Sequence, residues 1–312
     1  MPIVFEGTTI SGGISIEPYV PPNKKAIFGY GRISPNTNIT NLVSNTGVVG
    51  NDVTGVGTAR QFLAAASYGT DKSIFGYGYT NTFVSMTNLV STTGVVAANT
   101  TGVGTSRYEI AATGYGTDKA IFGYGIASGF ELSSITNLVN NTGVVATDTT
   151  GVGTARQGPA ATGYGSSGQA IFGYGTASPH VSITNLVSNT GVVGNDVTGV
   201  GTARRNLAAA GYGTDKAIFG YGVGAGGYLS MTKLVSNTGV VATDTTGVGT
   251  ARFALAAASY GTDTAIFGYG QSGPPDYFSL SLTNLVSNTG VVSTDTTGVG
   301  TARYGLAAAS YG

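Results

Sequence analysis

One arginine and one acidic residue recur along the chain at a constant spacing. Every copy of the sequence GVGTxR ends in arginine, and an aspartate lies eight residues before it, except where Asn99 replaces it. The residues are Arg60, Arg107, Arg156, Arg204, Arg252 and Arg303, with Asp52, Asp148, Asp196, Asp244 and Asp295. This spacing predicts a structural ring of charge pairs or loop-holding hydrogen bonds. A ring of arginines that binds an anion is the alternative. Repetition in every copy favours the structural role, because an active site needs one copy that differs.

The remaining chemically capable residues are few. His180 is the only histidine, and no nucleophile, carboxylate or metal-ligand spacing surrounds it, so we expect a contact residue. Glu109, Glu131 and Asp276 could supply a glycosidase pair only if two of them lay about 5–10 Å apart, which no spacing here predicts. GVGT lacks the Lys-Ser/Thr that follows in phosphate loops, and the EF-hand pattern is absent. We therefore predict no enzyme, catalytic residue, cofactor or metal.

Composition excludes several other classes. The formal net charge is zero and no basic block occurs. The sequence therefore offers no cluster of cations to neutralise phosphates, and nucleic-acid binding is not expected. The chain has no cysteine and therefore no disulfide framework. No apolar run approaches the ~18 residues of a membrane span, and MPIVFEGTT lacks the basic and apolar regions of a signal peptide. We expect neither membrane insertion nor a leader.

The elements that position these residues repeat with a period of about 48 residues. IFGYG starts at residues 27, 74, 121, 171, 218 and 266, and residues 41–60 and 185–204 are identical. Each unit reads as four short strands separated by turn signals, without helical periodicity. A period of this length with four strands is typical of a β-propeller blade. We therefore predict an all-β fold, a six-bladed β-propeller of four-stranded antiparallel blades.

The strand order resembles that of kelch-type propellers. An arginine opens the first strand, the glycine-rich second strand ends in IFGYG, TNLV forms the third and GVVATD the fourth. GYG stands where kelch repeats have a double glycine, and the kelch tryptophan is missing. The repeats start in a second strand (KKAIFGYG, from Lys24) and end in a first strand (residues 304–312). We expect these to pair and close the ring, which hides the sheet edges. Residues 24–312 then form one propeller.

Sequence variation is concentrated in two regions of each unit, the stretch between strands two and three and the two residues after each arginine. In an antiparallel blade both regions lie on the same face. Within residues 24–312, the aromatic residues outside the repeated positions all fall there: Phe62, Tyr79, Phe83, Tyr108, Phe130, Tyr228, Phe253, Tyr277, Phe278 and Tyr304. Aromatic rings supply large contact areas for recognition. We predict that they form a ligand-binding face together with His180. In the alternative, the sequences of these loops vary without a functional role, and their rings fill gaps between the blades.

Residues 1–23 precede the repeats, and IVFEGTTI and GGISIEPYV alternate apolar and polar residues. Such strands need a partner for their edges. We expect this segment to dock the propeller onto another subunit, or to add a strand to the propeller rim.

The units IFGYG, TNLVSNTGVVATDTTGVGTAR and LAAASYG resemble those of bacteriophage virion proteins, particularly of phages that infect cyanobacteria. This resemblance implies a component of the extracellular particle, multimeric on it, such as a tail fibre, a baseplate adhesin or a head decoration. Two functions follow. The first is non-enzymatic recognition of a host-surface glycan or receptor through the variable face. The second is an architectural role in which the variable loops contact neighbouring virion subunits.

Overall fold

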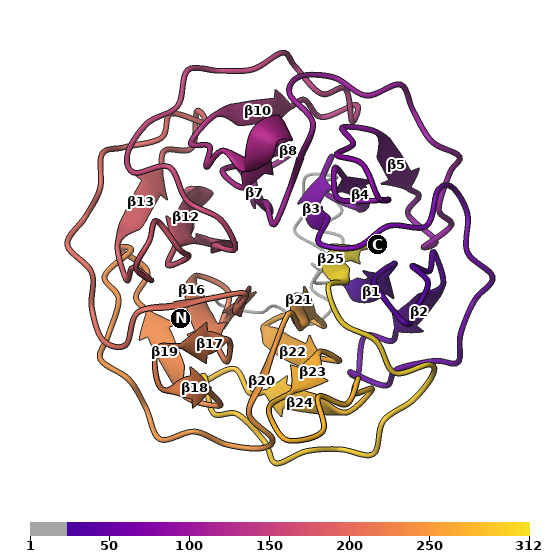
Figure 1. Ribbon diagram of the computed structural model, residues 1–312, viewed down its shortest axis with the longest axis vertical. Helices are drawn as coiled ribbons and strands as arrows, with labels where there is room; N and C mark the ends of the chain where they lie inside the picture. The colour runs from indigo at the N-terminus through magenta and orange to yellow at the C-terminus, as the bar shows by residue number, and fades with distance from the viewer. Residues whose placement is uncertain (1–23) are drawn as a thin grey trace, which may run out of the picture.

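The structure is a computed structural model that describes residues 24–312. The described chain is all-β apart from one short 3-10 turn, η1 (Ser128–Phe130), which confirms the predicted all-β class. Six similar three-stranded antiparallel sheets lie around an axis in a propeller-like arrangement (Figure 1). No helix in the described residues is long and apolar enough to cross a membrane. The predicted docking segment, residues 1–23, lies outside the described residues.

Each of the six sheets takes its strands from one repeat unit, except the first. Sheet 1 joins β25 (Ala307–Tyr311), β1 (Lys25–Gly29) and β2 (Thr40–Val43); sheet 2 joins β3 (Ala64–Tyr68), β4 (Lys72–Gly76) and β5 (Thr87–Val90). Sheet 3 joins β7 (Ala111–Tyr115), β8 (Lys119–Gly123) and β10 (Thr136–Val139); sheet 4 joins β11 (Ala160–Tyr164), β12 (Gln169–Gly173) and β13 (Thr184–Val187). Sheet 5 joins β15 (Ala208–Tyr212), β16 (Lys216–Gly220) and β19 (Thr232–Val235); sheet 6 joins β21 (Ala256–Tyr260), β22 (Thr264–Gly268) and β24 (Thr283–Val286).

The ends of the described chain meet within sheet 1. The C-terminal strand β25 pairs antiparallel with β1, with Ala309 opposite Ile27. The innermost strands contact one another in the order β25, β3, β7, β11, β15, β21 and again β25. Contacts between neighbouring sheets therefore run once around the axis without a break.

The predicted fourth strand is reduced to two isolated bridges per sheet. In sheet 1 these join Val49 to Val43 and Val53 to Thr40, and the other sheets have equivalent bridges. The side chain of Asn41 donates to the carbonyl of Gly50 at 3.0 Å, where a continuous ladder would place a backbone donor. The prediction of four regular strands was wrong in this respect, because side chains replace part of the outermost ladder.

The motif IFGYG builds the contacts between sheets. A Cβ on Gly29 would lie 2.7 Å from Cζ of Phe75 in the next sheet, so only glycine leaves room for this ring. The Phe75 ring also packs on Tyr30 with a centroid distance of 5.1 Å, and both side chains are fully buried. The same glycine–phenylalanine contact recurs between all neighbouring sheets, ending with Gly268 against Phe28. Burial of each phenylalanine contributes about 1.5–3 kcal/mol.

A closed ring of backbone hydrogen bonds surrounds the axis just before the innermost strands. Six residues form it, each donating its N–H to the carbonyl of the preceding one at 2.6–3.0 Å: Phe62, Glu109, Gly158, Asn206, Ala254 and Gly305. All six have positive φ, between +48° and +61°. We call them the axial ring. The sequence does not signal it, because four of the six are residues other than glycine.

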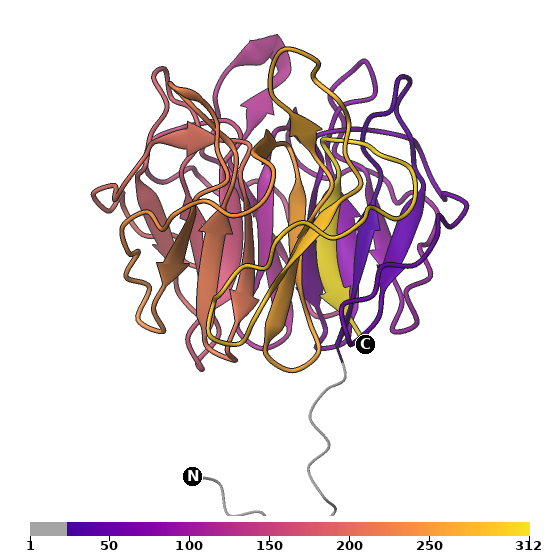
Figure 2. The same cartoon turned by 90° about the horizontal axis from the view of Figure 1, so that it is seen from below.

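The two faces of the molecule differ in what they carry. The turn face holds the loops between the first and second strands and the turns after the third strand; Asn141 and Asp118, one from each, are hydrogen-bonded at 2.9 Å. Lys24 lies there, bridged to Gly261, and so does the C-terminus (Figure 2). The opposite face, the variable face, carries the axial ring and the loops between the second and third strands.

Candidate functional site

Short additional strands on the variable face join the two variable regions of each unit. Three small sheets do so: β6 (Arg107–Tyr108) with β9 (Ile126–Ala127); β14 (Arg204–Arg205) with β17 (Val223–Gly224) and β18 (Gly227–Tyr228); and β20 (Arg252–Phe253) with β23 (Gln271–Ser272). Isolated bridges do the same elsewhere, such as Gln61 with Tyr79 and Gln157 with Thr176. The structure thus brings the residue after each arginine against the variable loop of the same unit.

Nine of the ten predicted aromatic residues form one chain of ring contacts, which we call the aromatic arc. From one end to the other the rings are Phe130, Phe83, Tyr79, Tyr108, Phe62, Tyr304, Phe253, Tyr228 and Tyr277, with centroids of successive rings 5.2–6.3 Å apart. The exposed fraction is 69% for Phe130 and 51% for Tyr277, and the rings between them are partly buried. The rings contact one another, and each keeps part of its surface accessible. Phe278, 62% exposed, stands outside the chain of contacts.

The aromatic arc is interrupted at sheet 4, where polar side chains take its place. The Nδ1 atom of His180 is hydrogen-bonded to Oγ1 of Thr176 at 2.6 Å. Burial and the nearby charge of Arg205 lower the pKa of His180. Arg205 also lies close enough to Tyr108 and Tyr228 for its charge to act on both hydroxyls. We call Gln157, Thr176 and His180 the polar sector. The predicted contact residue His180 thus belongs to the polar sector and not to the aromatic arc.

A small cavity of about 80 Å³, which we call the axial depression, lies at the centre of the variable face. The axial ring forms its rim, and the next residue of each unit forms its apolar wall: Leu63, Ile110, Pro159, Leu207, Leu255 and Leu306. Asn206 leans over Gly158, where its Oδ1 atom lies 2.2 Å from the position of a Cβ, and its Nδ2 donates to Oε1 of Glu109 at 3.4 Å. Burial raises the pKa of Glu109, while the charge of Arg205 and the Asn206 hydrogen bond oppose this.

The repeated arginines lie between sheets and not at a surface. Arg60 is fully buried; it donates to the carbonyls of Tyr77 and Thr58 and, at 2.7 Å, to Oδ1 of Asn88, and its guanidinium lies 4.3 Å from the Tyr30 ring centroid. All six arginines are equally inaccessible. Because all six side chains are enclosed by protein, with only Nε of Arg204 and of Arg252 lacking a hydrogen-bond partner, the alternative of an anion-binding arginine ring is wrong.

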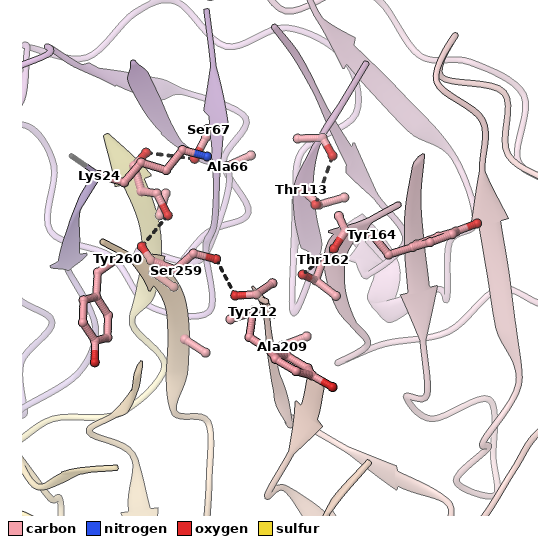
Figure 3. A pocket seen from close by; sticks show the side chains of 18 of the residues that line it. Lys24, Ala66, Ser67, Thr113, Thr162, Tyr164, Ala209, Tyr212, Ser259 and Tyr260 are labelled. Carbon is pink, nitrogen blue, oxygen red and sulfur yellow. Dashed lines mark hydrogen bonds between the residues drawn. The ribbon is translucent and has the colours of Figure 1, made fainter. Parts of the chain in front are cut away.

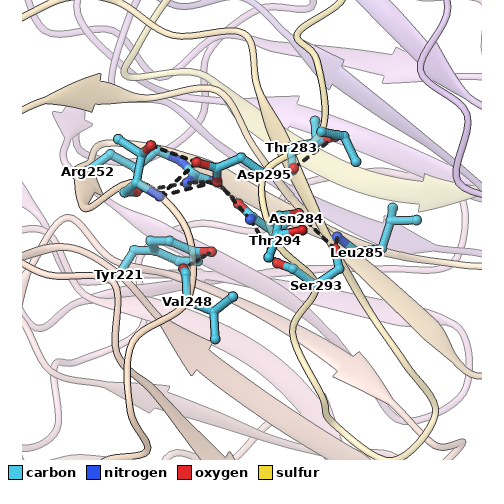
Figure 4. A network of polar contacts seen from close by, with 11 residues as sticks. Tyr221, Val248, Arg252, Thr283, Asn284, Leu285, Ser293, Thr294 and Asp295 are labelled. Atoms are coloured by element: carbon cyan, nitrogen blue, oxygen red, sulfur yellow. Dashed lines mark hydrogen bonds and ion pairs between the residues drawn. The ribbon is translucent and has the colours of Figure 1, made fainter.

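The aspartates take part in this network, but with a different arginine from the one that the spacing indicated. Figure 4 shows Arg252 donating to Asn284, whose Nδ2 donates in turn to Asp295 at 2.9 Å. Asp295 also accepts from the backbone N–H and hydroxyl of Thr250. Each arginine therefore connects with the aspartate of its own sheet, or with Asn99 in sheet 2. Arg303, near the end of the chain, connects through Asn41 with Asp52. Pairing across eight residues was wrong, because that aspartate already belongs to the sheet preceding the arginine's own.

Two sheets depart from the arginine–asparagine–aspartate pattern. In sheet 2, Asn99 replaces the aspartate and accepts from Asn88 at 3.0 Å. In sheet 5, Lys233 replaces the asparagine, and Asp244 accepts from both Arg204 and Lys233 at 2.7 Å. Burial lowers the pKa of Lys233 to about 8 despite the hydrogen bond from this lysine to Asp244.

A larger cavity of about 330 Å³ opens around the axis on the turn face (Figure 3). Small residues of the innermost strands line it, together with Lys24 and with turn residues such as Asp215, Lys216 and Asp263. Its serine hydroxyls already donate to neighbouring strands: Ser67 to the carbonyl of Ser310, Ser310 to that of Ser259, and Ser259 to that of Gly211. These hydroxyl groups therefore serve the scaffold.

The variable acids do not form a pair in the part of the chain that the structure describes. Glu109 lies on the axial ring, Glu131 lies beside η1, and Asp276 lies in the exposed loop after β23. No hydrogen bond joins any two of these three acids. Residues 24–312 also contain no cluster of three or more histidine, aspartate or glutamate side chains placed to hold a metal ion.

Comparison with known protein families and with curated proteins finds no match to this chain.

Proposed function

We propose that this protein is a non-enzymatic virion component that recognises a glycan or receptor on the host surface through its variable face. The aromatic arc is the observation that carries the proposal. Nine partly exposed rings held in mutual contact offer flat apolar surface at low entropic cost, which suits recognition more than solubility. The apolar faces of sugar rings fit such a surface, while the polar sector at sheet 4 offers groups for their hydroxyls.

We further propose that the chain forms a closed, six-bladed, kelch-like β-propeller. Three observations support this: the antiparallel pairing of β25 with β1, the unbroken contacts of the six innermost strands, and the axial ring of six mutual hydrogen bonds. The two bridges outside each third strand then mark the fourth strand of a blade. Closure holds the variable loops at fixed mutual positions, as a recognition face requires.

The position of Lys24 bears on how the proposed face is presented. Lys24, the first described residue, bridges Gly261 on the turn face, on the side opposite the aromatic arc. If residues 1–23 dock to other virion subunits, as we propose, the aromatic arc is directed away from the particle and toward a host cell.

An architectural role remains the second candidate because of a repeated apolar feature near the turn face. One valine per sheet, directly after the turn that follows the third strand, is 62–66% exposed: Val48, Val95, Val144, Val192, Val240 and Val291. Identical exposed groups in every sheet suit contact with a neighbouring subunit more than recognition of a host. In this alternative the variable loops contact subunits as well.

The test is binding of the full-length protein, presented multivalently, to cyanobacterial cells and to their extracted surface polysaccharide. One variant replaces Phe83, Phe130, Tyr277 and Phe278 with serine, which removes three exposed rings and the partly buried ring of Phe83 without touching the axial ring. We expect saturable binding of the wild type and a loss of at least tenfold in the variant. The matched control replaces four of the exposed valines with serine and is expected to bind normally. Absence of wild-type binding across a panel of strains would favour the architectural role.

A further inference from the structure

We infer that the axial depression is a subsite for the acetamido group of an N-acetylated sugar. The inference rests on the proposed function, since it names the ligand class of the same face. It depends on three features of this centre: an unpartnered acceptor, a donor beside it, and an apolar cavity of matching size.

The acceptor and the donor come from opposite sides of Gly158. The Oε2 atom of Glu109 is buried and has no hydrogen-bond partner, which is costly for a carboxyl group unless a ligand donates to it. The amide of Asn206 has two N–H groups and directs one at Oε1 of the same carboxyl. The other can serve a ligand acceptor. Burial raises the pKa of Glu109, and the charge of Arg205 opposes this. A carboxyl oxygen can accept a hydrogen bond in the neutral form as well.

The size and lining of the axial depression restrict what it can hold. Its volume of about 80 Å³ is far below the roughly 300–1,000 Å³ of pockets that enclose whole small ligands. Only a substituent of a larger ligand enters it. The wall below the rim is made of leucine, isoleucine and proline side chains, each burying apolar surface around the axis. The entering substituent therefore carries an apolar end.

An acetamido group has the required combination of parts. Its N–H donates to Oε2 of Glu109, its carbonyl accepts from Nδ2 of Asn206, and its methyl group occupies the apolar wall. The sugar ring that bears it then lies over the rim, where Phe62 lines the axial depression and contacts the rings of Tyr108 and Tyr304. A hydroxyl in the same position can donate and accept but leaves the apolar wall unfilled.

The experiment compares sugars that differ only in this group. Biosensor surfaces carrying multivalent N-acetylglucosamine or glucose, and N-acetylgalactosamine or galactose, are titrated with the full-length protein. We expect the acetylated member of at least one pair to bind at least tenfold more tightly. Glu109→Ala and Asn206→Ala are each expected to abolish this preference. Gln157→Ala, on the polar sector but outside the axial depression, is expected to keep it, and circular dichroism establishes that all variants are folded.

The outcomes separate this inference from the proposed function. Equal binding of both members of each pair, or a preference that survives in Glu109→Ala, overturns the acetamido subsite. So does binding of the wild type to surface polysaccharide without binding to either acetylated sugar, and recognition by the variable face then stands. Absence of binding to cells, polysaccharide and all four sugars overturns both. Loss of the preference in folded variants, with polysaccharide binding retained, supports the subsite.

Discussion

Replacing Lys233 with asparagine tests the energetics of the buried arginine network. In five sheets an asparagine lies between the buried arginine and the acidic residue or its asparagine substitute, whereas in sheet 5 Lys233 occupies this place. Lys233 and Arg204 are both fully buried and share a single carboxylate, Asp244. Two buried cations with one partner are poorly compensated. Lys233→Asn should therefore stabilise the protein by restoring the arrangement of the other sheets.

The magnitude follows from the pKa of Lys233. A decrease from the ordinary 10.5 to about 8 means that the folded state disfavours the protonated lysine. At about 1.4 kcal/mol per pKa unit, the cost at pH 7 is about 3 kcal/mol. The substitution removes this cost but also the hydrogen bond from Lys233 to Asp244, so we expect a net gain of about 2–3 kcal/mol. In a chain of this size that raises Tm by roughly 3–5 °C.

The sign of the pH dependence is equally specific. Because the folded pKa is the lower one, the unfolded state binds more protons between pH 8 and 10.5, and the stability of the wild type rises there. The advantage of Lys233→Asn should thus fall by about 2 kcal/mol from pH 7 to pH 9.5. Burial raises the pKa of several tyrosines, such as Tyr221 to about 12. These tyrosines therefore lower the stability of the folded state only above pH 10.

Urea unfolding at pH 7 and pH 9.5 measures both effects without adding salt. The matched control, Asn185→Lys in sheet 4, places a lysine beside Arg156 and Asp196 and should destabilise by a similar amount at pH 7. A Lys233→Asn variant that is no more stable than the wild type at pH 7 would refute the reasoning. An advantage independent of pH would show that packing, and not the buried charge, is responsible.

Three further substitutions test the scaffold, each by urea unfolding at pH 7. Gly163→Ser should stabilise by about 0.5–1.5 kcal/mol, because its φ is ordinary and a hydroxyl there can reach the neighbouring innermost strand as that of Ser259 does; an unchanged midpoint would contradict this. Gly76→Ala should destabilise by about 1–3 kcal/mol, since the new Cβ would lie 2.7 Å from Cζ of Phe122, and a neutral effect would show that the ring moves freely. Asn99→Asp should stabilise by about 1 kcal/mol, because the Thr58 N–H, which now donates to an amide oxygen, would donate to a carboxylate. The four aspartates with equivalent hydrogen bonds and an asparagine partner have lowered pKa values, in each case against the effect of burial, so this gain should vanish as the pH falls below 4.

The regular part of the fold was predictable because the motifs act locally and repeat. IFGYG, TNLV and the turn residues specify strands and turns by their own chemistry, and six copies leave no doubt about the unit. The shared location of the variable regions followed from strand alternation alone. The aromatic arc could be anticipated as a set of residues, but its order could not. Phe62 joins Tyr304 although 242 positions separate them in the chain, since the first and last units are neighbours around the axis.

The features that sequence reasoning missed depend on neighbouring sheets. The spacing of Asp52 and Arg60 suggested a pair, yet Asp52 accepts from Thr301 and lies near Arg303, at the other end of the chain. The axial ring places Phe62 and Glu109 at positive φ, which neither residue type favours. Only the hydrogen bonds between neighbouring units hold them there, and no property of a single unit reveals those bonds.

The same dependence on neighbours explains why some positions repeat without change while others vary. Each scaffold residue must fit two sheets at once: Gly76 must admit the ring of Phe122, and Arg60 must reach Asn88 while stacking on Tyr30. A change in one unit therefore alters its contacts with the neighbouring unit, whereas identical units satisfy the contacts between all six sheets. The axial ring imposes no such match on side chains, because its bonds are made by backbone atoms alone. The four side chains on the axial ring, those of Phe62, Glu109, Asn206 and Ala254, can then differ, and substitutions of these four residues should alter binding while changing stability little.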